Sequence, residues 1–354
     1  MSEISAQLAA ALPPGPVGRP DWFNSLRNSG AEQFRAHGLP LRKDEAWKYT
    51  GLGLITQRET RLADVDELAE LGSGAQPVVS VDHHLNIVNG RFLETSVTSV
   101  EGVTVLPLAQ AVENDVSGLR DLLESLPAST AKQLSADGFS ALNTATLENG
   151  VFIHVGAGIE GGRLLLNTYT TANDSARLFN IRVCVILGEG ASLELLEQFE
   201  TPHANTNTTN VVLQLELGKG ASLQHVRLQQ ESEETGLITR TEVSQMASSE
   251  YSYYGFDLGG GLVRHDLHTS LTGEGARASL NGAYLLDNKR HVDNHARVDH
   301  IAPGGFSEQY FRGVAGGSGR AVFNTAVCVH PGADETEALQ SNANILLSRR
   351  AEID

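Results

Sequence analysis

The stretch HVDNHARVDH, residues 291–300, places three histidines and two aspartates among ten positions. Side chains of these types can ligate a metal ion, serve as catalytic acids and bases, or form the polar face of a strand. Successive residues of a strand point to opposite faces. One face then carries His291, Asp293, His295, Arg297 and Asp299. The opposite face is more apolar and carries Val292, Asn294, Ala296, Val298 and His300. This alternation favours a strand whose polar face contacts solvent or a partner protein.

The same spacing argues against a metal site within the stretch. His291 and His295 lie about 13 Å apart along a strand that rises ~3.3 Å per residue. Zinc requires each ligand nitrogen within roughly 2.1 Å. The two histidines could share an ion only on a helix, which the surrounding alternation disfavours.

A second candidate pair, Cys328 and His330, lies in AVCVHPGA. The two alternate with valines, so both point to one side with Cα atoms roughly 6.6 Å apart. A Cys-x-His pair can supply two soft ligands but cannot complete a site alone. We therefore expect two outward side chains near a turn and no metal or cofactor held by this chain alone. The sequence also contains no GxSxG, P-loop, HExxH or repeated cysteine spacing.

Composition limits the class of protein further. The chain has 354 residues, a length typical of about two domains. Its formal net charge of −17 argues against nucleic acid or anionic lipid as the main partner, since both bind basic faces. No run approaches the ~18 apolar residues of a membrane span. The N-terminus does not resemble a signal peptide, and the two cysteines form no CxxC pair, so we expect a cytoplasmic protein.

An internal repeat indicates what positions these side chains. IRVCVILGEGASL (181–193) and VVLQLELGKGASL (211–223) superimpose at a shift of 30 residues, with weaker echoes at 155–166, 272–280 and 316–323. Each unit is an alternating strand, a Gly-x-Gly corner and the start of a second strand. Stacked units of this kind favour a parallel β-helix, although the spacing also fits an antiparallel sandwich. In the β-helix, one core contains Ile181, Val183, Val185, Leu187, Val211, Leu213, Leu215 and Leu217.

The chain before the repeats combines patterns typical of helices with patterns typical of turns and loops. Trp22, Phe23, Leu26 and Phe34 have helical spacing, and Gly38 and Pro40 follow them. A second helix is expected in SGLRDLLESLPAST and should end near Pro127. The pair Asn89-Gly90 predicts a tight turn. His83 and His84 are expected to lie in a loop. We divide the chain into an N-terminal helical region (1–75), a mixed α/β connecting region (76–145) and a β-helix core (146–354).

Three stretches together resemble one family: RKDEAWKYT (42–50), DNHARVDH (293–300) and the run from GRAVFNTAVCVHPGADETEA to the end (319–354). They are similar to the SufD side of the SufB/SufD family, which belongs to the SUF machinery for iron–sulfur cluster assembly. The resemblance implies a mainly β fold, a right-handed parallel β-helix preceded by helices. It also implies a non-catalytic scaffold that pairs with a SufB-like subunit through the β-helix and with a SufC-like ATPase through a C-terminal segment. A cluster would form transiently at the SufB–SufD interface, and the polar strand 291–300 is a candidate partner interface.

Two departures from the family pattern affect what can be carried over. Relatives continue past AEID into a Cys-Ser-His-Gly stretch and helices, so we expect the family's C-terminal helical segment, and its cluster-linked histidine, to lie outside these residues. The chain as given is then expected to bind the ATPase poorly and to self-associate. Gly304-Gly305 occupies the place of a common His-Cys pair, and Cys328 replaces a usual aliphatic residue. No residue is therefore assigned a catalytic or cofactor-binding role.

The alternative is a β-helix polysaccharide lyase or hydrolase. Such an enzyme needs carboxylates and a base clustered on one face. His291, Asp293, Asp299 and Arg312 are the residues that could fill these roles.

Overall fold

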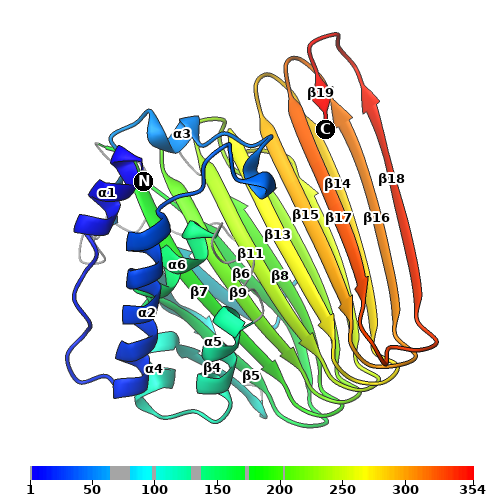
Figure 1. Cartoon of the computed structure of the whole chain (residues 1–354). Helices are drawn as coiled ribbons and strands as arrows, with labels where there is room; N and C mark the ends of the chain where they lie inside the picture. The colour runs from blue at the N-terminus through cyan, green and yellow to red at the C-terminus, as the bar shows by residue number, and fades with distance from the viewer. Residues whose placement is uncertain (1, 64–79, 98–100, 129–136, 172–174, 202–203) are drawn as a thin grey trace.

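The computed structural model describes residues 2–63, 80–97, 101–128, 137–171, 175–201 and 204–354. Two sheets form the walls of a parallel β-solenoid, and short helices lie along the outside of one sheet (Figure 1). The helices are α1 (Glu3–Ala10), α2 (Asp21–His37), the 3-10 turn η1 (Glu45–Trp47), α3 (Gly53–Thr56), α4 (Leu108–Glu113), α5 (Leu119–Ala128) and α6 (Gly138–Ala145). None of the helices in these ranges has the length and apolar character needed to cross a membrane.

The ten-stranded sheet is called sheet A. In spatial order it contains β4 (Val103–Pro107), β5 (Gly150–Val155), β7 (Arg177–Leu187), β9 (Thr208–Leu217), β11 (Gly236–Gln245), β13 (Leu262–Leu271), β15 (His291–His300), β17 (Arg320–Val329) and β19 (Glu352–Ile353), with β1 (Arg61–Leu62) beside β7. From β5 to β19 every neighbouring pair is parallel.

The nine-stranded sheet is called sheet B. In spatial order it contains β3 (Arg91–Val97), β2 (His83–Val88), β6 (Glu160–Tyr169), β8 (Ser192–Glu200), β10 (Ser222–Gln230), β12 (Glu250–Asp257), β14 (Arg277–Leu286), β16 (Phe306–Ala315) and β18 (Glu337–Leu346). Because the chain alternates between the sheets, each turn of the solenoid adds one strand to each. The 30-residue shift is one such turn, which confirms the parallel β-helix and excludes the antiparallel sandwich.

The predicted core residues pair as the repeat requires. Val183 is in register with Leu213, and Val185 with Leu215. All eight predicted positions lie in the main hydrophobic core between the sheets, each at most 3% exposed. The alternation of apolar residues along β7 and β9 therefore places their apolar side chains inside the solenoid on each of these turns.

Glycines permit the tight corners between strands. Gly190 and Gly220 both adopt φ +65°, a left-handed conformation that favours glycine. Gly188 and Gly218 stack on successive turns, and a Cβ on Gly218 would lie 2.8 Å from the carbonyl carbon of Gly188. Side chains at these corners would separate the turns, which explains the repeated Gly-x-Gly.

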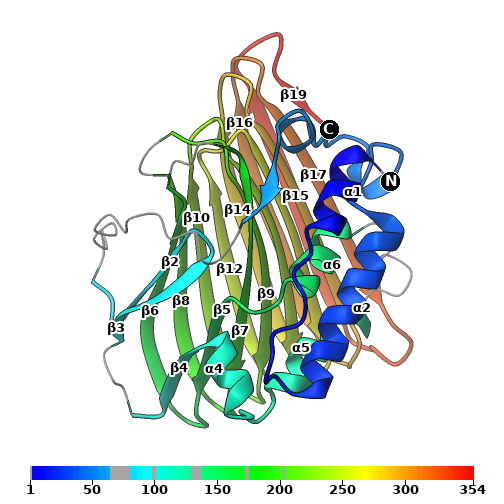
Figure 2. The ribbon, with the colours of Figure 1, turned by 90° about the vertical axis from the view of Figure 1, so that its left-hand side faces the viewer.

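The helices cover the outer face of sheet A near its N-terminal end (Figures 1 and 2). Phe23 of α2 and Leu123 of α5 pack with Cys184, which points outward from β7 and is fully buried. The helix expected around Phe23 and Phe34 is confirmed as α2, which ends at His37 and is followed by Gly38 with φ +67°. The second expected helix is confirmed as α5, which ends one residue after Pro127.

The expected turn at Asn89-Gly90 is confirmed, since it joins the antiparallel strands β2 and β3 with positive φ at both residues. The loop expected at His83 and His84 is wrong. Both residues begin β2 and pair in parallel with Leu164 and Leu165 of β6. Their pairing continues the register of Leu85 and Ile87 with β6 without interruption, so the histidines belong to the strand.

Candidate functional site

A charged surface continues sheet A beyond the helical layer. It is formed by the outward residues of β11, β13, β15 and β17 and is called the polar face. Strand register aligns Glu242, His268 and Arg297 in one row, and Asp299 lies beside Cys328 in another. The predicted alternation of 291–300 is confirmed, because Val292, Ala296 and Val298 lie in the core while the charged residues point outward.

The N-terminal part of β15 is covered by the chain itself. Residues 45–50, called the cover segment, lie over Asp293 and His291. Thr50 Oγ1 donates to Asp293 Oδ2 at 2.5 Å and lies 2.9 Å from His291 Nε2. Asp293 is only 1% exposed, so this end of the strand faces the cover segment instead of solvent.

Arg264 on β13 neutralises the covered carboxylate. Its Nη1 forms an ion pair with Asp293 and donates to the Ala46 carbonyl at 2.8 Å, while its guanidinium lies 4.0 Å from the centre of the Trp47 ring. Burial alone would raise the pKa of Asp293, but the charge of Arg264 and hydrogen bonds from His295 and Thr50 lower it to about 2. Burial lowers the pKa of His291 to about 4, so this imidazole is neutral at pH 7.

The other end of β15 carries a second network, centred on Asp299. His268 Nε2 lies 2.5 Å from Asp299 Oδ2, and its Nδ1 lies 2.8 Å from Glu242 Oε2. Arg297 donates two hydrogen bonds to the same carboxylate, from Nε and from Nη2, each at 2.8 Å. Burial alone would lower the pKa of His268, but its hydrogen bonds to Asp299 and Glu242 raise it to about 9. Hydrogen bonds from His268, Arg297 and His330 outweigh burial and hold the pKa of Asp299 well below its ordinary value.

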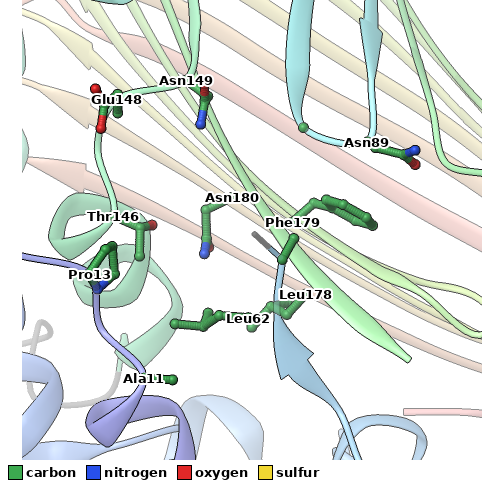
Figure 3. Close-up of a pocket in the computed structure, with 12 residues that line it drawn as sticks. Ala11, Pro13, Leu62, Asn89, Thr146, Glu148, Asn149, Leu178, Phe179 and Asn180 are labelled. Atoms are coloured by element: carbon green, nitrogen blue, oxygen red, sulfur yellow. The ribbon is translucent and has the colours of Figure 1, made fainter. Parts of the chain in front are cut away.

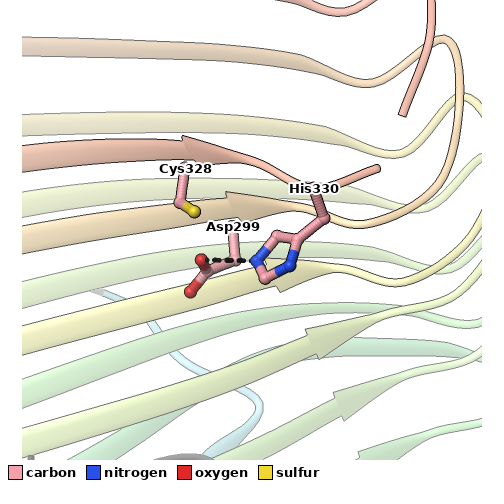
Figure 4. A group of neighbouring side chains, drawn as sticks. All are labelled: Asp299, Cys328 and His330. Atoms are coloured by element: carbon pink, nitrogen blue, oxygen red, sulfur yellow. Dashed lines mark hydrogen bonds and ion pairs between the residues drawn. The ribbon is translucent and has the colours of Figure 1, made fainter. Parts of the chain in front are cut away.

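Cys328 and His330 join this network from the neighbouring strand (Figure 4). His330 Nε2 lies 2.9 Å from Asp299 Oδ1. One ligand atom each from Asp299, Cys328 and His330 lies within 4.8 Å of the others. The sequence indicated Cys328 and His330, but not Asp299 as their neighbour. The repeat could have revealed it, because Asp299 precedes Cys328 by 29 residues, close to one turn of the solenoid.

The constellation expected for a polysaccharide enzyme is not assembled. His291, Asp293 and Asp299 project from sheet A, whereas Arg312 lies on β16 in sheet B. There its guanidinium stacks 3.6 Å from the centre of the Tyr310 ring, and Nη2 donates to Ser341 Oγ at 2.9 Å. Arg312 is therefore on another wall of the solenoid.

Several hollows adjoin sheet A, among them one of about 660 Å³ at the start of β13 and β15. A hollow of about 530 Å³ lies between the cover segment and the polar face, bordered by Trp47, Tyr49, His295, Arg297 and Phe323. Another, of about 300 Å³, is lined mainly by amide, hydroxyl and aliphatic groups near the β2–β3 turn, with Glu148 at its border (Figure 3). Arg19 and Arg27 each form an ion pair with one oxygen of the Glu148 carboxylate at 3.5 Å, so the charge of this side chain is already balanced within the chain. The hollow of about 530 Å³ borders the polar face along β13, β15 and β17.

Sequence reasoning missed a polar network inside the solenoid. Arg227 on β10 donates to Tyr253 Oη at 2.9 Å and to Asp257 Oδ1 at 2.6 Å. Tyr253 Oη also lies 3.0 Å from His265 Nδ1. These residues are at most 3% exposed. These residues lie at the inward positions of their strands. Polar side chains at such alternate positions are usually taken for the solvent-facing side of a strand, so the sequence did not indicate that they are buried.

Two family models and several characterised proteins match this chain. A family model described as "SUF system FeS cluster assembly, SufBD core domain" matches residues 169–354, and one described as "SufBD protein N-terminal region" matches residues 18–164. The iron-sulfur cluster assembly protein SufD of Escherichia coli is 25% identical over 327 residues, covering 91% of this chain and 74% of that protein. Protein ABCI7, chloroplastic, of Arabidopsis thaliana is 29% identical over 369 residues, covering 99% and 72%. The iron-sulfur cluster assembly protein SufB of Bacillus subtilis is 24% identical over 191 residues, covering 53% and 41%.

Proposed function

Because the chain belongs to the SufBD family of the SUF system for iron–sulfur cluster assembly, we propose that it is a non-catalytic scaffold subunit of a cluster assembly complex. In this proposal it pairs with a SufB-like subunit through the solenoid and works with a SufC-like ATPase subunit. The nascent cluster is cargo of the complex, formed transiently at the interface with the SufB-like subunit. The observation that carries the proposal is the match of both family models across residues 18–164 and 169–354.

The chemistry of the polar face supports a scaffold. Asp293 is neutralised by Arg264, and Asp299 by Arg297 and His268. A general acid needs a carboxyl group with a raised pKa, whereas the pKa values of both aspartates are lowered. These ion pairs stabilise the outer wall of the solenoid and leave neither aspartate ready to donate a proton.

The geometry opposes the rival polysaccharide enzyme. Asp293 and Asp299 are six residues apart on one strand, which separates their Cα atoms by about 20 Å. Glycosidases hold their two carboxyl groups roughly 5 to 9.5 Å apart. Arg312, the proposed cation, belongs to the other sheet. The residues chosen for that activity cannot act on one glycosidic bond.

The proposed partner contact can be narrowed to part of the polar face. The sequence indicated His291, Asp293, His295, Arg297 and Asp299 as partner-facing. The first two lie under the cover segment, and Asp299 is 6% exposed. We therefore assign the contact to His295, Arg297 and the exposed neighbours Asn324 and Ala326 on β17. A rigid strand array presents such a surface without rearrangement.

Affinity capture tests both the scaffold role and the contact assigned to the polar face. The tagged chain is co-expressed with the SufB-like and SufC-like subunits of its source cell and captured on a resin. Wild type is expected to retain the SufB-like subunit directly and the SufC-like subunit through it, and Ala326→Arg is expected to retain less of the SufB-like one. Gln224→Arg places the same side chain on the exposed outer face of sheet B and serves as the matched control. Recovery of neither subunit by wild type would refute the scaffold role, whereas equal recovery by both variants would refute only the assigned contact.

A further inference from the structure

Three side chains with metal-binding atoms converge at the C-terminal ends of β15 and β17. Asp299 contributes a carboxylate oxygen, Cys328 a sulfur and His330 a ring nitrogen, all within 4.8 Å of one another (Figure 4). We propose that these three residues form a binding site for a divalent metal ion of the zinc type. The site is independent of any partner subunit, because all three ligands belong to this chain.

The separations suit a tetrahedral ion after small movements. With metal–oxygen and metal–nitrogen bonds of about 2.1 Å and a metal–sulfur bond of ~2.3 Å, tetrahedral geometry places ligand atoms roughly 3.3 to 3.7 Å apart. His330 Nε2 and Asp299 Oδ1 are now 2.9 Å apart, joined by a hydrogen bond. The ion takes the place of the Nε2 proton, which moves to Nδ1 through solvent, and the Cys328 thiol releases one proton. Sulfur, nitrogen and oxygen together suit zinc or cobalt better than magnesium or calcium.

The carboxylate is already oriented by a surrounding shell. Arg297 donates to both oxygens of Asp299, and His268 contacts Oδ2 at 2.5 Å. Hydrogen bonds of this kind orient the ligands of metal sites. His268 occupies the Oδ2 side, so Oδ1 is the oxygen that faces His330 and the ion.

The setting predicts an exchangeable ion. Three protein ligands leave a fourth tetrahedral position for water, and His330 is 41% exposed, so solvent can reach the site. The cations Arg297 and His268 lie beside the carboxylate and oppose a further positive charge. The expectation of no resident metal rested on the spacing of His291 and His295 and on the lack of a third ligand beside Cys328 and His330. With Asp299 as that third ligand, the site is expected to load when metal is supplied and to empty on purification.

Cobalt(II) is the direct probe because its spectrum reports the ligand type. The reduced, metal-free chain of 354 residues is titrated with Co²⁺ under argon, and the absorption spectrum is recorded. We expect a thiolate-to-cobalt charge-transfer band and strong tetrahedral ligand-field bands that saturate at one equivalent and disappear when Zn²⁺ is added. Absence of the charge-transfer band in wild type would overturn the proposal.

Matched variants identify the ligands. Cys328→Ser should abolish the charge-transfer band, whereas Cys184→Ser, at the cysteine buried under the helices, should retain it. His330→Gln should weaken Co²⁺ binding at least tenfold, whereas His37→Gln, at an exposed helical histidine, should not. Circular dichroism confirms the fold of each variant, and His330→Gln, at a half-exposed position, keeps the test valid if Cys328→Ser unfolds. A band that survives Cys328→Ser, or unchanged affinity in His330→Gln, would contradict the site.

Discussion

The Thr50 hydroxyl donates a hydrogen bond to the Asp293 carboxylate across 243 positions of sequence, at 2.5 Å. This contact joins the N-terminal cover segment to the polar face of the solenoid. The two residues belong to RKDEAWKYT and DNHARVDH, two of the stretches on which the family resemblance rested. Their proximity gives those stretches a shared structural role, since the cover segment buries a carboxylate that Arg264 neutralises.

We predict that this contact holds the cover segment in place. Asp293→Asn should lower the free energy of unfolding by about 3 kcal/mol, because it removes one partner of the buried Arg264 ion pair. Thr50→Val should cost about 1 kcal/mol through the lost hydrogen bond. Urea denaturation measures both changes, and hydrogen exchange of residues 45–50 should accelerate in each variant. Thr56→Val, at an exposed threonine of α3, is the control; unchanged exchange in Asp293→Asn would contradict the contact.

The raised pKa of His268 predicts a specific dependence of stability on pH. Because that pKa rises from 6.5 to about 9 on folding, the protonated histidine stabilises the protein fully below pH 6.5. This contribution declines as the pH rises through 9. The difference in unfolding free energy between wild type and His268→Gln should therefore shrink between pH 6.5 and 9. Urea midpoints measured across that range test the prediction, with the exposed His37→Gln as control. A difference that grows with pH would show that His268 is not a folded-state cation.

The solenoid core predicts a strong effect of charge at a repeat position. Val185→Asp places a carboxylate among apolar side chains that are in register with Leu215. We expect a loss of about 3 kcal/mol or more, because the charge is buried without a partner. Chemical denaturation provides the measurement, and Gln224→Asp on the exposed side of sheet B should change stability little. Equal stability of the two variants would be incompatible with the observed core.

The sequence predicted the parts of the fold that depend on local alternation. The shared phase of Val185 and Leu215 predicted the core, and the glycine repeats predicted the corners. Contacts between distant segments could not be predicted in this way. Nothing near Asp293 indicates that Thr50 covers it, because the two residues are 243 positions apart. Arg264 precedes Asp293 by only one turn of the solenoid, but their burial under the cover segment could not be predicted from the repeat. The inward position of the polar residues of β10 was missed for another reason. Arg227 resembles a solvent-facing residue in the sequence, and only the structure shows that Tyr253 and Asp257 accept its hydrogen bonds inside the solenoid.

The central claim is that this chain is a scaffold subunit of an iron–sulfur cluster assembly complex. Native mass spectrometry of the chain co-expressed with the SufB-like and SufC-like subunits of its source cell tests that claim most directly. We predict a discrete complex whose mass includes this chain together with both subunits, and whose dissociation in the gas phase releases each of them. Spectra that show this chain only by itself, while the other two subunits associate without it, would contradict the account.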